Sequence, residues 1–335
     1  MTADLIFRPI GGPDEIDLFN AFPGPYNDRL AEDLETGRRR YEWLWLALHD
    51  GRPVARVGWW SSRAGGPPEV LDTIDMGETL DGLTSHDTGR ALARPTPLDA
   101  GGDPGAVDLA ERLLRAAMGA VLPPGTPPPP CVLQPVPVDW RDDETAGRLT
   151  KARVEVVERT GGRMFVERLR YRWTAGTPLP EPSRRLTFRE AGGDEETVAL
   201  LEGILSGTLD AYSRADIARS SIEEYAREQY HSELLTYPSP REWWRVGLTP
   251  GGEPVGLVVP ARNSYAFILA YIGVAEGHRG HGYVNDLLAE GTRLLAGHGA
   301  TQIMADTDLA NTPMSKAFTR AGYQNHARRL DLTWG

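Results

Sequence analysis

A glycine-rich turn in the second half of the chain has residue types that could hold a phosphate group. Residues 267–274 have the apolar pattern of a strand and run into Arg279-Gly-His-Gly-Tyr-Val284, after which apolar residues recur at helical spacing. Glycines between a strand and a helix let several backbone N–H groups converge at the helix N-terminus, where the helix dipole favours an anion. Arg279 adds a charged donor. Taken alone the turn is not specific, because short glycine turns are common.

A second motif follows the glycine-rich turn in the sequence. A strand pattern at residues 302–306 leads to Asn311, then Phe318 seven residues later, and then Gly322-Tyr323. The two motifs together resemble those of the GNAT superfamily of acetyl-CoA-dependent N-acyltransferases. That family writes its turn R/Q-x-x-G-x-G/A, which residues 279–284 fill with Val in the last place, and its later segment as Asn, Tyr seven residues on, then Gly-Phe.

The resemblance implies an α/β fold with a splayed pair of parallel strands, here 267–274 and 302–307. The pantetheine arm of acetyl-CoA, the expected co-substrate, would lie between these strands. Backbone groups of Ile272 and Val274 would pair with its amides. The Val274 N–H would lie at the thioester carbonyl, where negative charge develops as an amine attacks, so Val274 is an expected catalytic position.

The resemblance also assigns a set of residues to the cofactor. The expected cofactor-binding residues are Ile272, Val274, Arg279, Gly280, His281, Gly282, Tyr283, Val284, Asn311 and Phe318.

The usual acid and base of this family are missing. Phe318 stands where many members have a tyrosine that protonates the leaving thiolate, and residues 263–273 contain no carboxylate. Asp306 and Asp308, at the end of the second splayed strand, could hold a cationic amine or accept its proton, and we select Asp306 as the catalytic carboxylate. The same two residues could equally be a solvated loop and helix-cap pair.

Other side chains remain open as donors, bases or acceptor contacts. They are Tyr271 and Tyr283 near the turn, Glu276 and His278 beside it, and Asp210, Tyr212, Tyr230 and His231 in the helical stretch that forms the acceptor pocket in this family.

The sequence pattern indicates a duplicated domain. Leu5–Gly12 recurs as Leu186–Gly193, and each copy continues into strand, turn and helix patterns in the same order. Repeats of this kind decide the architecture. We expect two tandem GNAT-like domains, each a mixed α/β sheet with helices on both faces, as in tandem members such as mycothiol synthase. Residues 1–174 would form the degenerate first domain, 175–185 a proline-rich linker, and 186–335 the acyl-CoA domain.

The first half departs from the family at its own turn. Asp99 and Asp103 precede the helix at 107–118, and no arginine stands there. Because carboxylates repel phosphate, we expect the first half to be a scaffold. The alternative is that it keeps a cofactor through Arg90 or Arg94.

The charge and the cysteine content of the chain disfavour several classes of partner and cofactor. The chain has 335 residues and a net charge of −11, which disfavours nucleic acid and anionic membranes as partners. A single cysteine, Cys131, excludes a disulfide framework and a four-cysteine zinc site, and we expect no metal.

The expected function is transfer of an acyl group, most simply acetyl, to a small-molecule amine by direct attack on the thioester. The alternative is a non-catalytic acyl-CoA-binding protein. The N-terminus has no basic-then-apolar segment, so we expect a cytoplasmic protein, with a monomer as the working hypothesis.

Overall fold

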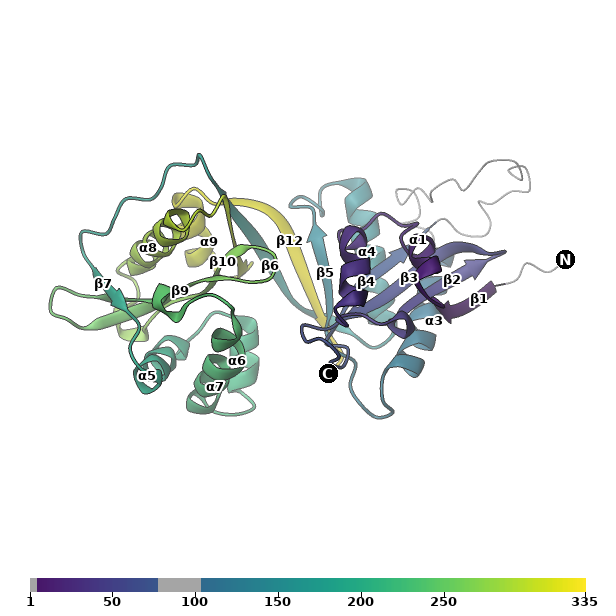
Figure 1. Ribbon diagram of the computed structural model, residues 1–335, viewed down its shortest axis with the longest axis horizontal. Coiled ribbons are helices and arrows are strands. Elements are labelled where there is room, and N and C mark those ends of the chain that lie inside the picture. Colours follow the sequence, from purple (N-terminus) through teal and green to yellow (C-terminus); the bar gives the residue numbers. More distant parts are fainter. Residues whose placement is uncertain (1–4, 78–103) are drawn as a thin grey trace. The chain divides into compact units, whose positions relative to one another are not determined.

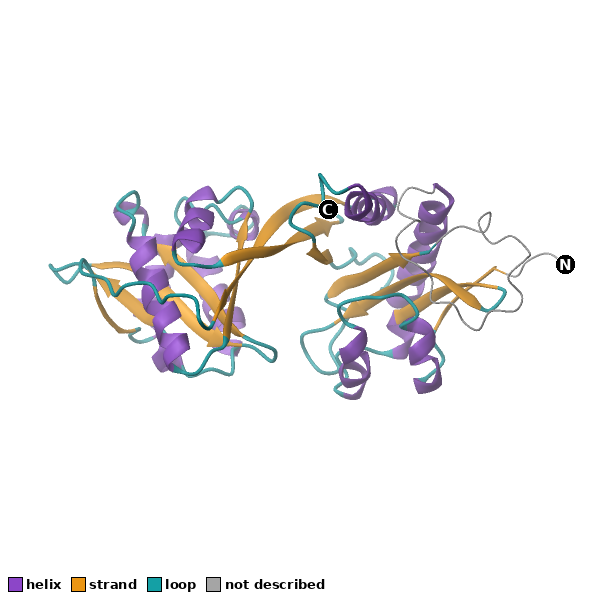
Figure 2. Ribbon diagram, turned by 90° about the horizontal axis from the view of Figure 1, so that it is seen from above, coloured by secondary structure: helices purple, strands orange, loops and turns teal. Residues whose placement is uncertain are grey.

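The computed structural model describes residues 5–77 and 104–335, and these divide into two compact units (Figures 1 and 2). Unit 1 comprises residues up to Glu167 together with Arg328–Gly335, and unit 2 comprises Arg168–Ala327. Each unit therefore includes the final strand of the other half of the chain. Most of the loop that precedes the helix at 107–118, with Asp99, Asp103, Arg90 and Arg94, lies outside the described residues.

Unit 1 is a mixed sheet in the order β1-β2-β3-β4-β5-β12. Its pairings are antiparallel except for β4 with β5, which run parallel. Helices cover both faces: α3 and α4 pack on one apolar cluster, and α1 and α2 on another. Its elements are β1 (Leu5–Pro9), α1 (Ile16–Phe19), α2 (Leu30–Glu35), β2 (Leu44–His49), β3 (Arg52–Trp60), β4 (Val70–Met76), α3 (Pro104–Val121), β5 (Cys131–Val136), α4 (Glu144–Arg159) and the end of β12 (Gln324–Thr333).

Unit 2 repeats this plan in the order β6-β11-β10-β9-β8-β7. In Figure 1, α8 and α9 lie above its strands and α5, α6 and α7 below them. Its elements are the end of β6 (Arg163–Thr174), β7 (Thr187–Glu190), α5 (Asp194–Leu205), α6 (Ala211–Ile217), α7 (Ile222–Glu228), β8 (Arg245–Leu248), β9 (Pro254–Arg262), β10 (Phe267–Val274), α8 (Tyr283–Gly297), β11 (Gln302–Asp308) and α9 (Thr312–Arg320). The expected fold, two tandem domains with mixed sheets and helices on both faces, is confirmed.

Side-chain alternation explains why β6 suits the sheet of unit 2. Leu169, Tyr171 and Trp173 are buried in the cluster beneath α8 and α9, while the arginines between them point to the other face. A strand with this period of two has one apolar and one polar face. The apolar face contributes to the core, and the polar face is left to interact with the α6 side of the unit.

Candidate functional site

The two central parallel strands of unit 2 part soon after they begin. Strands β10 and β11 pair at Phe267–Ile303 and Ile268–Met304, and beyond these positions their described residues form no further ladder. Strand β10 stays paired with β9 as far as Val274, with an irregularity between Leu269 and Tyr271. The parallel pair is therefore splayed, as the sequence motifs predicted.

The backbone of β10 presents alternate peptide groups to this splayed side. The Ala275 N–H donates to the Val255 carbonyl of β9 at 2.9 Å. Peptide groups in an antiparallel pair alternate in direction, so those of Gly273 also face β9, and those of Ile272 and Val274 face the side on which β11 diverges. The N–H groups of Ile272 and Val274 thus point away from β9, while the Val274 carbonyl accepts from Arg279 Nε at 3.1 Å. Pairing of these two residues with a ligand stays a prediction.

Close packing fixes β10 against α5. A Cβ on Gly273 would lie 2.1 Å from the Ile204 side chain, so only glycine allows this approach. The helix that buttresses the strand consequently lies on the face opposite to α8 and α9.

The glycine-rich turn joins β10 to α8 as expected. Gly280 and Gly282 have φ angles of +80° and +76°, a left-handed conformation that glycine adopts without strain, and Gly282 is the N-cap of α8. The first N–H groups of a helix lack intrahelical acceptors. At the 15-residue helix α8 they form a donor-rich terminus directly after the splayed strand.

The Arg279 side chain is engaged with the backbone of its own unit. Its guanidinium donates to three carbonyls, those of Val274 at 3.1 Å, Gly207 at 2.9 Å and Ile204 at 2.6 Å. It therefore ties the turn to the end of β10 and to the end of α5. A direct contact between Arg279 and a phosphate stays a prediction.

A second arginine at the turn was missed by the sequence reasoning. Arg185 donates to the carbonyls of His281 at 2.7 Å and Gly282 at 3.3 Å, forms an ion pair with Asp286, and lies 5.1 Å from the centroid of the Tyr283 ring. It belongs to the segment interpreted as a linker, where nothing in the local pattern indicated a contact almost a hundred residues away.

The motif residues of α9 are placed at its start and in its core. The Asn311 Oδ1 accepts the Met314 N–H at 3.3 Å and caps the helix. Phe318 is buried and stacks on Tyr171 of β6 with the ring centroids 4.8 Å apart. The Tyr171 hydroxyl is hydrogen-bonded to Ser315 Oγ at 2.8 Å, so a strand from the other half of the chain brings a phenol next to the phenylalanine.

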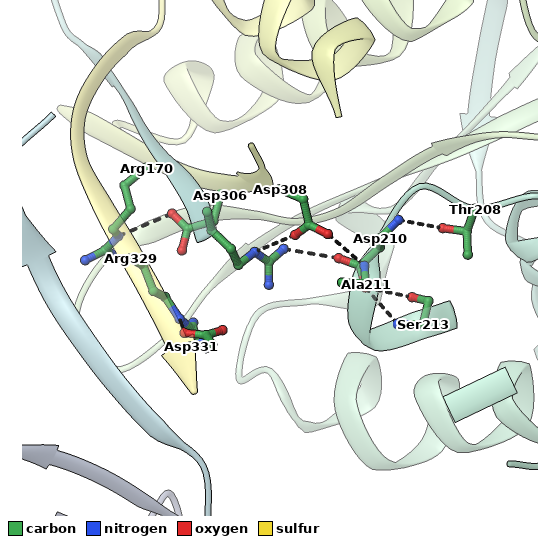
Figure 3. A network of polar contacts seen from close by, with 10 residues as sticks. Arg170, Thr208, Asp210, Ala211, Ser213, Asp306, Asp308, Arg329 and Asp331 are labelled. Carbon is green, nitrogen blue, oxygen red and sulfur yellow. Dashed lines mark hydrogen bonds and ion pairs between the residues drawn. The ribbon is translucent and has the colours of Figure 1, made fainter. Parts of the chain in front are cut away.

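The two candidate carboxylates of β11 lie on its polar face but differ in their surroundings (Figure 3). Asp306 is partly exposed, and its Oδ1 lies 3.3 Å from Arg170 Nε. Asp308 is buried, and its Oδ2 accepts the Ala211 N–H of α6 at 2.7 Å. Burial, followed by the nearby charge of Asp210, raises the pKa of Asp308. Asp306 is consequently the more accessible of the two.

Asp210, one of the open acceptor candidates, joins the same network. It caps α6 by accepting the Ser213 N–H at 2.8 Å. Arg168 of β6 bridges it to Asp308, with N···O distances of 3.4 Å and 3.2 Å. Tertiary structure therefore assembles α6, β11 and β6 into one charged surface, which we call the polar face of unit 2 and define by Asp210, Asp306, Asp308, Arg168 and Arg170.

Glu233 is a further group that the sequence reasoning did not single out. It ends a π-helical turn, Gln229–Glu233, a distortion that is rare in proteins and recurs at functional sites. Burial, then the charge of Asp210, raises its pKa. Burial also raises the pKa of Tyr271 on β10, and Asp210 and Glu233 add to that effect.

The remaining candidates lie apart from this network or at its edge. The buried Tyr230 hydroxyl donates to Asp194 at 2.6 Å, and burial raises the pKa of Tyr230 to about 12. Glu276 accepts the Ser206 hydroxyl at 2.5 Å. His231 is exposed beside Tyr230, Tyr212 lies in α6, and His278 and His281 flank the Tyr283 ring.

In unit 1 the corresponding strands are also splayed, and charged side chains of the unit are buried in ion pairs with carboxylates of β4. The described residues of β4 and β5 pair at Leu71–Cys131 alone. Buried Arg39 is bound to Asp72 at 2.6 Å, and buried Arg56 to Asp75 at 2.7 Å. The cavity that remains beside these ion pairs measures about 30 Å³, room for about two water molecules.

Sequence comparison matches part of the chain to one family. Residues 207–323 match the model of the acetyltransferase (GNAT) family. This segment is similar to a GNAT domain. The matched segment spans the splayed strands, the glycine-rich turn and α9, so the GNAT motifs and the geometry coincide.

Solved structures extend the GNAT likeness to the fold of the whole chain. A GCN5-related N-acetyltransferase from Sphaerobacter thermophilus is 16% identical, with a TM-score of 0.56 over 98% of this chain and 94% of that one. A glucosamine N-acetyltransferase region of a fungal multi-domain β-N-acetylglucosaminidase is 14% identical, with a TM-score of 0.53 over 99% of this chain and 38% of that one.

A tandem GNAT protein from the clavulanic acid biosynthesis pathway is 13% identical, with a TM-score of 0.49 over 98% of both chains. No curated protein matches the chain. The GNAT fold suggests an acyl-CoA-dependent acyltransferase. Among the described residues, no helix has the length and apolarity needed to cross a bilayer.

Proposed function

We propose that the protein is an acyl-CoA-dependent N-acyltransferase whose acyl donor is acetyl-CoA. Unit 2 would carry out the reaction, and the acceptor would be a small-molecule amine. The observation that carries this proposal is the position of the donor-rich turn. It follows directly on the strand whose backbone is open on its splayed side. One extended ligand with an anionic end could therefore use both features.

The residues present fit such a co-substrate. The peptide groups of Ile272 and the N–H of Val274 are directed to the splayed side and would pair with pantetheine, while the Val274 carbonyl is held by Arg279. The N–H groups at the start of α8 would hold the pyrophosphate. Bound acetyl-CoA would supply an activated acetyl group as a thioester.

The chain's own residues then act on the amine. The amine nitrogen, once it has lost a proton, forms a bond to the thioester carbonyl carbon, the carbon–sulfur bond breaks, and its electron pair leaves with sulfur as the CoA thiolate. The second proton, which the nitrogen carries after the attack, passes to solvent. The Val274 N–H donates to the carbonyl oxygen while it is negatively charged. A thiol with a pKa of about 8.5 can leave as the thiolate without being protonated by a general acid. This suits a site in which Phe318 stands in place of the tyrosine that would supply the proton.

Asp306 is the carboxylate that we propose for holding the ammonium and receiving its proton. It is partly exposed, and its ion pair with Arg170 runs through Oδ1. Asp308 is already held by Arg168 and by α6, which favours a supporting role. Unit 1 would serve as a scaffold, because the β4 carboxylates Asp72 and Asp75 are already neutralised by buried arginines and the cavity beside them measures only about 30 Å³.

Native mass spectrometry with added acetyl-CoA tests the first step. We expect one bound cofactor per chain. Two would overturn the scaffold role of unit 1, and none would overturn the proposed function. Release of free CoA that depends on added amines tests the second step, and binding without any release would favour the non-catalytic alternative.

Asp306→Asn tests the catalytic assignment. The variant should keep its acetyl-CoA affinity and lose about a hundredfold in turnover, the usual contribution of a positioned base. Unchanged turnover would remove Asp306 from the mechanism.

A further inference from the structure

Three arginines, Arg168, Arg170 and Arg172, lie on the side of β6 that faces away from the core beneath α8 and α9. The third differs from the other two in the residue that lies opposite it on β11. In the register with β11, Arg168 lies opposite Asp308, Arg170 opposite Asp306, and Arg172 opposite Met304. Since alternate residues of a strand share a face, the three guanidinium groups form a row. Two of them face a carboxylate, and the third faces a thioether.

The ion pairs follow this register. Arg168 is paired with Asp308 and Asp210, and Arg170 with Asp306. Within the described residues Arg172 has no ion-pair partner, although it is only partly exposed. A guanidinium in this position carries a positive charge that the unit does not neutralise.

His326 of β12 lies beside the same row. Its Nε2 atom is buried and has no hydrogen-bond partner in the described structure. Burial, then the charges of Arg172 and Arg170, lowers the pKa of His326, and Asp306 opposes that shift. The neighbouring Asn325 donates to the Arg170 carbonyl at 3.0 Å and holds the start of β12 against β6.

We propose that Arg172 and His326 form an anion subsite, which would bind a carboxylate or phosphate group of the acceptor while Asp306 holds its amine. Arg172 would supply an unneutralised guanidinium, and His326 a buried nitrogen without a partner. Arg172 is two residues from Arg170, the register partner of Asp306, so Asp306 and Arg172 are diagonal neighbours about 7–8 Å apart on the same face. A small acceptor with both charges would span that distance. This inference rests on the proposed function for the identity of the acceptor.

The acceptor class that follows is a small molecule with an amine and an anionic group. A simple cation would gain nothing from Arg172, and an uncharged amine would leave that guanidinium unpaired. The charges of the polar face favour a molecule that is itself positive at one end and negative at the other.

The first test measures binding without any acyl transfer. The pKa of His326 is followed by NMR with and without inorganic phosphate, and His326→Gln assigns the signal. A bound anion stabilises the imidazolium, so phosphate should raise the His326 pKa in the wild-type protein and leave it unchanged in Arg172→Gln. An equal response in both proteins means an adventitious ion only and would overturn the subsite, as would no response.

The second test measures specificity with matched amines. The pairs are β-alanine with β-alaninamide, and glucosamine 6-phosphate with glucosamine. Arg172→Gln should lower kcat/KM about tenfold or more for the anionic member of the accepted pair and leave its neutral partner unaffected, as expected for a lost charge-assisted contact. Arg63→Gln, which removes an exposed arginine of unit 1, should change neither.

Failure of the anion subsite and failure of the proposed function give different results in these tests. Equal losses for both members of a pair would overturn the subsite and leave the acyltransferase standing. If no amine is acylated while phosphate still shifts the His326 pKa through Arg172, the proposed function fails and the anion site remains.

Discussion

At the scale of single residues, Arg279 shows how a motif residue can act through its backbone neighbours. Sequence predicts a charged donor for a phosphate, whereas the structure gives its guanidinium three carbonyl acceptors on β10, α5 and the following turn. A guanidinium suits this task because its planar array of donors reaches several acceptors at once. The residue therefore positions the N–H groups that would meet the anion.

Arg279→Glu should weaken acetyl-CoA binding by about tenfold or more, because a carboxylate cannot donate to the three carbonyls and the turn loses its anchor. Isothermal titration calorimetry measures the effect. Arg63→Glu is the matched control, since that side chain is exposed and belongs to unit 1. Equal affinities in the Arg279 variant and the wild type would contradict the role given to this arginine.

At the scale of elements, the candidate site depends on where one strand ends and one helix begins. The splay of β10 from β11 exposes peptide groups, and the left-handed Gly282 turns the chain so that α8 starts beside them. Each element is ordinary by itself. Their junction is what places the N-terminus of α8 near the end of the splayed strand.

Alanine at Gly282 tests this junction. A residue with a Cβ pays about 1–2 kcal/mol in the left-handed region, so the turn should relax and acetyl-CoA affinity should fall by about fivefold or more. Gly297→Ala is the control within the same helix, because a Cβ there meets open space and its φ is not left-handed. That variant should keep full affinity, and a parallel loss in both would refute the proposed use of the helix start.

At the scale of the whole molecule, the two units exchange their final strands. The end of β6 completes the sheet of unit 2, and the end of β12 pairs with β5 in unit 1. Leu330 and Leu332 of β12 are fully buried in the core of unit 1. The polar face of unit 2 in turn depends on Arg168 and Arg170 from the strand that ends the first half.

Leu332→Ala should therefore destabilise unit 1, although the residue is almost the last of the chain. Removing a buried leucine side chain costs about 2–5 kcal/mol. Hydrogen exchange followed by mass spectrometry should show lost protection in β4 and β5 and retained protection in β9 and α8. The matched change Leu269→Ala, in the core of unit 2, should give the reverse pattern. Loss confined to unit 2 in the first variant would disprove the exchange.

The sequence by itself determined the features that depend on local chain geometry. Glycines at 280 and 282, the apolar pattern of 267–274 and the repeat of Leu5–Gly12 predicted a strand, a turn, a helix and a duplicated domain, because turn conformations and strand periods are encoded within a few residues. The splayed strand pair was predicted by the family resemblance.

Only the tertiary structure decided which distant side chains meet. Arg185 joins the turn, Tyr171 stacks on Phe318, and Arg172 lies beside His326. These contacts arise because strand pairing joins β6 to β11 and β12, segments more than a hundred residues apart, and no short-range pattern records such a register. The charged surface that selects an acceptor is therefore a property of the sheet.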